Sequence, residues 1–466
     1  MIWTTFLLGL APLGGAPATL SPQDFPPAVL AQMRQVGGTF AIRARLAETV
    51  AGGPLEHAVV LVENGEITTV GEDLPIERGI AVIDLPDDWV VLPGLVNAYT
   101  RVGMDSRGYS DSRGNLLASA ELYPSAEDYR KVLEAGVTTL GEYPAGNGIP
   151  GQAVAVRPHG ATPAEMIVQD RVYLKILLDR ASAGAKKLIS DGFDKADDYL
   201  EKEAKNREKW EKEQEKRKKD EKKKEDEKKK EDEKKKEDEK KKEDEKKEGE
   251  EQKEEGADEK KGEGKDEKQE SDEYVPLEPD PRVKPFLDLR AGTLKALVSI
   301  GGSSEYLHLL DAIGDEEFTW NLRIPITREI DVFEIQDRVV EKGCRVVFEP
   351  ELSLHPGTMR QRNIPAEYAR AGVPIVLIPR NDQVSSHQSW LRDVGAAVAA
   401  GLERQAAIRA MTQEPADLLG VGDRVGSIEK GKRANLVFLN GDPFEPGTKV
   451  MAVMLEGKLF SGEVDL

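Results

Sequence analysis

The sequence has a single cysteine and fewer basic than acidic residues, 66 against 86, and each of these features excludes a class of protein. A single cysteine, Cys344, excludes an intramolecular disulfide framework and any metal site built from several cysteines. The net charge is −20, and about −17 of it lies outside the segment 201–270. A negative surface spread over the foldable part repels phosphate backbones and anionic lipid, so general nucleic-acid binding is not expected.

Charged residues are concentrated in one internal segment. In 201–270, 59 of the 70 residues are charged, which leaves too few apolar side chains for a core. Lys-Lys-Lys-Glu-Asp-Glu repeats four times in 222–245, placing opposite charges three and four residues apart. No apolar seam accompanies the repeat, so a coiled coil is not predicted. We expect 197–275 to be a low-complexity insertion, either disordered or a solvated helix, and a charged docking arm is the functional alternative.

The N-terminus predicts export. Residues 2–13 form an apolar run of signal-peptide length, followed by Ala16 and Ala18 in a pattern typical of a cleavage site. The run is too short for a stable membrane span. We therefore expect 1–20 to be a signal peptide and the mature protein to be periplasmic or extracellular.

The rest of the chain alternates between two patterns. Short apolar runs separated by Gly, Asn and Asp occupy both ends, and Asn64-Gly65 between two such runs is typical of a β-hairpin. The middle alternates strand-like runs with helical patterns, including 126–135, 305–313, 332–342 and 391–400. This alternation predicts parallel βαβ units, and the available length fits an eightfold barrel only if the barrel is lean or incomplete.

Three stretches resemble the amidohydrolase superfamily, particularly its imidazolonepropionase-like branch. They are VVLPGLVNAYTRVG in 90–103, AGVTTL in 135–140, and the long stretch 407–460 that contains RAMTQEPADLLGVGDRVGSIEKGKRANLVFLNGDPFEP. The resemblance implies a TIM-like (β/α)8 barrel with a small composite β-sandwich built from both chain ends. It assigns 94–196 and 276–424 to the barrel, and 38–93 and 425–462 to the sandwich.

The resemblance also implies a metal site, and the sequence departs from it. Members of the family place His-x-His at the end of the first barrel strand, where this chain has Tyr99 and Arg101. The family's last-strand aspartate falls on Arg380, with Asp382 two residues further on. Arginine stays protonated and has no lone pair for a metal, so no metal cofactor is expected, although the family uses zinc or another divalent ion. A lysine of the family's fourth strand would correspond to Lys175, without an assigned role.

The five histidines do not replace the missing ligands. Only His387, just after the last barrel strand, is placed to face the barrel mouth; the others are His57, His159, His308 and His355. A remodelled catalytic site would therefore depend on Asp382 and His387, with Tyr99 beside them. No G-x-S-x-G motif occurs, and Cys344 has no histidine nearby in sequence, so covalent hydrolysis has no support.

Two arginines at the mouth suggest other roles for it. Arg101 and Arg380 would bind a small anionic ligand, or would pair with internal acids such as Glu142, Glu349 or Asp382 and fill the barrel. We expect a helix cap at Gly301-Gly302-Ser303-Ser304. The alternative is an anion-binding site at the N-terminus of the helix that follows.

The sequence therefore predicts an amidohydrolase-like protein whose family hydrolyses C–N bonds of amides or cyclic amides. Here we expect a pseudoenzyme, a non-catalytic homologue with a binding or scaffolding role. The alternatives are an active C–N hydrolase with a remodelled site and an interaction module that acts through the charged insertion.

Overall fold

The computed structural model describes residues 38–108, 113–178, 183–245, 273–461 and 464–465. The predicted signal peptide, 1–20, lies outside these residues. The chain divides into two compact units, one formed by Met1–Gly192 with Pro281–Leu466 and the other by Phe193–Asp280. None of the described helices is both long and apolar enough to cross a membrane.

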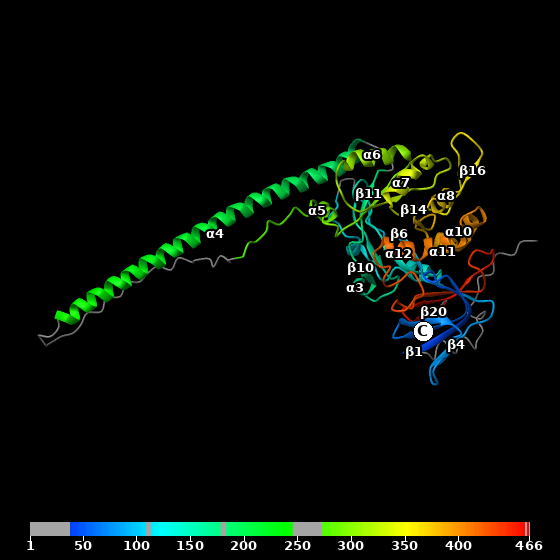
Figure 1. The fold of residues 1–466 in the computed structure, drawn as a ribbon. Coiled ribbons are helices and arrows are strands. Elements are labelled where there is room, and N and C mark those ends of the chain that lie inside the picture. The colour runs from blue at the N-terminus through cyan, green and yellow to red at the C-terminus, as the bar shows by residue number, and fades with distance from the viewer. Residues whose placement is uncertain (1–37, 109–112, 179–182, 246–272, 462–463, 466) are drawn as a thin grey trace, which may run out of the picture. The chain divides into compact units, whose positions relative to one another are not determined.

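Both ends of the chain contribute to one nine-stranded sheet, in which blue N-terminal and red C-terminal strands lie together in Figure 1. The strand order is β21-β20-β19-β18-β5-β1-β2-β3, with β4 paired to β1. The N-terminal strands are β1 (Thr39–Glu48), β2 (Pro54–Glu63), β3 (Glu66–Glu72), β4 (Ala81–Asp84) and β5 (Val90–Pro93). The C-terminal strands are β18 (Leu436–Leu439), β19 (Val450–Leu455), β20 (Lys458–Ser461) and β21 (Val464–Asp465).

The sheet encloses a core of its own. Alternate residues of β1, Phe40, Ile42 and Ala44, lie in one buried cluster with side chains from β2, β3, β5 and β18–β20. The predicted hairpin at Asn64-Gly65 joins β2 to β3, and both residues have positive φ, as a tight two-residue turn requires. Leu133 of the helix α2 (Glu127–Glu134) covers part of the opposite face, against Val453 and Leu455.

The middle of the chain supplies a second set of strands, ordered β17-β14-β13-β12-β11-β8 in one sheet and β10-β9-β7-β6 in another. The first four in sequence are β6 (Leu95–Thr100), β7 (Val137–Glu142), β8 (Gly151–Gln152) and β9 (Val154–Val156). The others are β10 (Ile167–Gln169), β11 (Leu174–Leu177), β12 (Ala296–Ser299), β13 (Trp320–Arg323), β14 (Val346–Phe348) and β17 (Ile375–Leu377). A separate hairpin pairs β15 (Ser353–Leu354) with β16 (Gln361–Arg362).

The mixed α/β fold is confirmed, but these strands form no closed barrel among the described residues. The consecutive strands β8 and β9 run antiparallel to their neighbours β11 and β7, whereas every neighbouring pair from β11 to β17 is parallel. No backbone ladder joins β6 to β17. The expected (β/α)8 pattern is therefore realised as an open series of strands with one reversed segment.

Helices cover the strands and largely follow the predicted positions. The main unit has η2 (Ala118–Glu121), α2 (Glu127–Glu134), α3 (Pro163–Met166), α5 (Lys284–Arg290), α6 (Ser303–Ile313), η3 (Val332–Ile335) and α7 (Gln336–Lys342). Its remaining helices are α8 (Ile364–Arg370), α9 (Val384–Gln388), α10 (Trp390–Ala399), α11 (Arg404–Met411) and α12 (Gln413–Leu418). The four helical patterns expected at 126–135, 305–313, 332–342 and 391–400 correspond to α2, α6, η3 with α7, and α10.

The unit Phe193–Asp280 consists mainly of a long helix, α4 (Ala183–Glu245), which begins in the main unit. The helix includes residues 222–245, which contain the four charged repeats. Ion pairs four residues apart, Glu201 with Lys205 and Glu208 with Lys212, lie on its exposed surface. Such exposed pairs stabilise a helix only weakly.

Candidate functional site

The carboxyl ends of the middle strands gather two tyrosines and two buried cations. The rings of Tyr99, in β6, and Tyr143, just after β7, have centroids 4.1 Å apart. The Nζ atom of Lys175, in β11, lies 3.4 Å from the Tyr143 centroid and 5.1 Å from that of Tyr99. Arg323 ends β13, and its Cζ atom lies 5.3 Å from the Tyr99 centroid. Both cations thus contact the negative faces of one aromatic pair, an interaction that gains strength away from water.

Arg323 has one acidic partner and one donor without a partner. Its Nη2 atom donates to Oε1 of Glu349, and the other oxygen of Glu349 accepts a hydrogen bond of 3.0 Å from the backbone N–H of Ile326. Arg323 is 9% exposed, and its Nη1 atom is buried without a hydrogen-bond partner. A buried donor left unpaired costs about 1–3 kcal/mol, or more on a charged group.

The two arginines expected at the mouth are not brought together. The guanidinium of Arg101 donates to the carbonyl of Tyr143 and to Ser106, and lies 3.6 Å from Glu121. Arg380 is half exposed and pairs with Glu351 and Asp393, each at 3.3 Å. Both arginines are therefore paired with acids, but with different acids from those expected.

Asp382 and His387 connect the segment after β17 to β6. Oδ1 of Asp382 accepts hydrogen bonds from Thr100 Oγ1 at 2.9 Å and from the backbone N–H of Arg101 at 3.0 Å. The ring of His387 lies 2.9 Å from both the Asn97 amide and the carbonyl of Gln383. These contacts link the two strands that no backbone ladder joins.

The hydrogen bonds of His387 define its chemistry. The carbonyl of Gln383 can only accept, so Nδ1 carries the proton, and Nε2 accepts from the Asn97 amide. Burial lowers the pKa of His387, which favours this neutral form. Neither ring nitrogen is left for a metal or a substrate.

Glu142, at the end of β7, is a second buried acid near the mouth. It is fully buried, its Oε2 accepts from Tyr129 Oη at 3.1 Å, and its Oε1 has no hydrogen-bond partner. Burial raises the pKa of Glu142 to about 8, against the opposing effects of Tyr129 and Arg101. The carboxyl is therefore largely protonated at neutral pH.

The remaining histidines lie apart from the mouth. His57 has a positive φ in β2, His159 packs edge-on against Phe460, His308 lies in α6, and His355 contacts Arg362. Across the part of the chain that the structure describes, no three His, Cys, Asp or Glu side chains are grouped so that they could hold a metal ion. Tyrosine, lysine and arginine at the strand ends do not fit the divalent ion that the family resemblance implies.

Two other features give no catalytic group. The backbone N–H and hydroxyl of Ser303 both donate to Asp331, at 2.8 and 2.6 Å, so the chain's own carboxylate lies where an anion would enter the start of α6. Gly302 is the N-terminal cap of α6, so this segment serves as the helix cap that its sequence predicts. Cys344 is buried, and burial raises the pKa of its thiol to about 12, which suppresses the nucleophilic thiolate.

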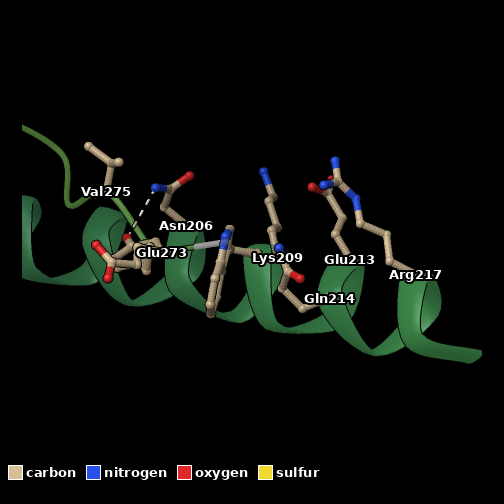
Figure 2. Close-up of a pocket in the computed structure, with 9 residues that line it drawn as sticks. Asn206, Lys209, Glu213, Gln214, Arg217, Glu273 and Val275 are labelled. Atoms are coloured by element: carbon tan, nitrogen blue, oxygen red, sulfur yellow. Dashed lines mark hydrogen bonds between the residues drawn. The ribbon is translucent and has the colours of Figure 1, made fainter. Parts of the chain in front are cut away.

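The unit Phe193–Asp280 has a shallow surface pocket of its own, of about 350 Å³. Figure 2 shows that Asn206, Lys209, Glu213 and Arg217 line it along one side of α4, with Glu273 and Val275 beside the helix. Asn206 donates to Tyr274 Oη at 3.1 Å, and the Tyr274 and Trp210 rings meet edge to face. The pocket is lined mainly by polar side chains and is open to solvent. The contacts of Tyr274 with Asn206 and Trp210 hold the segment around Tyr274 against α4.

Comparisons with known proteins bear on this geometry. Residues 375–460 match the amidohydrolase family. This match covers the C-terminal part of the chain only. No curated protein sequence matches it. The narrower resemblance to the imidazolonepropionase-like branch stays a prediction.

Solved structures of two hydrolases share the fold of this chain. An amidohydrolase from Thermotoga maritima MSB8 is 19% identical with a TM-score of 0.66, covering 91% of this chain and 100% of its own. A prolidase complexed with N-methylphosphonate-L-proline is 12% identical with a TM-score of 0.50, covering 91% and 99%. At these identities the likeness establishes the fold alone.

The sequence predicts Tyr99 as a mouth residue and leaves Lys175 without a role, but it does not predict Arg323. The available signal for Arg323 is a charged residue at the end of the short strand Trp320–Arg323. The structure brings these three side chains together. The Cζ atom of Arg101 also lies 5.9 Å from the centroid of Tyr143, whereas Arg380 pairs with Glu351 and Asp393.

Proposed function

We propose that this protein is a member of the amidohydrolase superfamily that has lost metal-dependent hydrolysis and serves a binding role. One observation carries the proposal: Lys175 and Arg323 contact the ring of Tyr99 at the strand ends, where the family resemblance implies a metal. A fixed guanidinium has no lone pair, and two buried cations repel a dication by electrostatics. The mouth keeps positive charge but supplies no Lewis acid and no group that would activate a water molecule.

A remodelled active hydrolase is the main alternative, and the hydrogen bonds of its two candidate groups oppose it. His387 uses both ring nitrogens within the protein, so it cannot accept a proton from water without losing the Asn97 contact. Oδ1 of Asp382 accepts two hydrogen bonds from β6 and the residue that follows it. These contacts support a structural role for both residues.

The proposal is tested with C–N substrates. Purified protein, incubated with zinc or manganese and then freed of excess ion, would be assayed with X-Pro dipeptides and N-acyl amino acids. We expect the hydrolysis rate with the protein to equal the rate in buffer without protein, both before and after addition of a chelator. A rate that requires the metal, disappears with the chelator and falls in Asp382→Asn would contradict the proposal.

The interaction-module alternative needs a separate test. A chain without 201–270 is expected to retain the binding activity of the main unit, because the mouth residues lie outside that segment. Loss of every partner on deletion would favour the charged segment as the functional part.

A further inference from the structure

The buried Nη1 atom of Arg323 points to a ligand class. Arg323 is paired through Nη2 with Glu349, and its guanidinium lies over Tyr99, so the side chain is held in place on two sides. Nη1 remains buried and without a partner. Because buried polar donors are nearly always satisfied, an unsatisfied donor on a fixed arginine indicates a group that binds there.

We infer that Arg323 and Lys175 bind the carboxylate of a small organic anion against the face of Tyr99. This inference rests on the proposed binding role and names the chemistry of its ligand. Nη1 of Arg323 donates to one carboxylate oxygen, and the ammonium of Lys175, which lies on the same tyrosine pair, supplies the second positive charge. Charge-assisted hydrogen bonds of this kind are among the strongest in proteins.

The arrangement favours a carboxylate over a phosphate. Arg323 already holds one carboxylate, that of Glu349, and the second oxygen of Glu349 is occupied by the N–H of Ile326, so Glu349 leaves Nη1 to another acceptor. A planar monoanion matches the flat guanidinium and the aromatic faces. Glu349 already offsets one of the two positive charges of Arg323 and Lys175, so the remaining charge matches a monoanion, and a phosphate dianion would leave one buried negative charge uncompensated.

Formate and acetate are the direct probes, because they contain little more than the group that is recognised. Full-length protein, treated with a chelator to exclude any metal effect, would be titrated in a thermal-shift assay at constant ionic strength, with chloride and acetamide as controls. At an anion concentration ten times Kd, the expected rise in Tm is about 2 °C. Equal effects of formate, acetate and chloride would overturn the inference, and so would a larger rise with phosphate than with formate.

Variants separate the site from general salt effects. Arg323→Gln should abolish the shift, and Glu349→Gln should lower Kd for formate at least threefold because it frees Nη2 for the same anion. Arg345→Gln is the matched control, since Arg345 pairs with Glu414 and Asp417 away from the mouth and its loss should leave Kd unchanged. If Glu349→Gln weakened binding, or Arg345→Gln abolished it, the assignment would be wrong.

The two proposals fail in different ways. Binding of formate together with metal-dependent hydrolysis would refute the loss of catalysis and keep the anion site. Absence of binding in a metal-free, inactive protein would refute the anion site alone.

Discussion

Replacing Glu142 with glutamine should change how the stability of the protein depends on pH. The Glu142 carboxyl is fully buried at the end of β7, with Tyr129 donating to one oxygen and no hydrogen-bond partner for the other. Burial raises its pKa from 4.5 to about 8. Glutamine keeps the shape and the acceptor for Tyr129 but cannot ionise.

The sign follows from proton binding in the two states. Between pH 4.5 and 8 the unfolded chain has lost the Glu142 proton while the folded chain retains it, so unfolding releases a proton and the free energy of unfolding falls as pH rises. The contribution is fully present below pH 4.5 and lost by about pH 8. The slope is about 1.4 kcal/mol per pH unit, so from pH 5.5 to 7.5 the wild type loses about 2.7 kcal/mol relative to Glu142→Gln.

Urea unfolding at both pH values measures this difference. The absolute stability of Glu142→Gln also includes the cost of burying an amide, which does not vary with pH, so the change in the difference is the readout. Glu127→Gln is the control, because the side chain of Glu127 is 67% exposed on α2. Parallel pH profiles for wild type and Glu142→Gln would refute the reasoning.

Three further predictions concern the mouth and the insertion. Burial lowers the pKa of His387, so acidification below pH 6.5 should destabilise the wild type, and His387→Gln should reduce that loss in thermal unfolding from pH 7 to 5. Arg323→Met leaves Glu349 buried without its cation and should cost about 3–5 kcal/mol in urea unfolding, and a double-mutant cycle with Glu349→Gln should recover part of it. Deleting 201–270 should leave the Tm of the main unit unchanged, because its cores lie outside that segment, and a large fall would contradict the division into two units.

The parts of the fold that the sequence predicts are those with local signals, such as turns, strands and helices. Asn64-Gly65 gave the β2–β3 hairpin because few residues accept two consecutive positive φ angles. The apolar, strand-like run 89–96 is divided at Gly94 into β5 and β6. A side chain at Gly94 would meet the side chain of Thr138 at 2.1 Å, so the break depends on a tertiary contact that the pattern does not contain.

The sequence pattern does not predict which segments that are distant in the chain pair with each other. The reversal of β8 and β9 depends on strand pairing across the sheet, which periodicity alone does not report. The sequence places Asp382 and His387 just after the last strand, but whether they act on a substrate or hold β6 in place depends on their hydrogen-bond partners. Arg101 and Arg380 follow two strands that have no backbone ladder between them, and each finds local acids instead.

Metal content tests the central claim most directly. Protein expressed and purified with added zinc, manganese or iron would be analysed for bound transition metals after desalting, alongside a chelator-treated sample. The account predicts far less than one ion per chain in both samples, since Lys175, Arg323 and Tyr99 fill the strand ends. One or more tightly held ions per chain, lost with the chelator and located beside Tyr99, would contradict it.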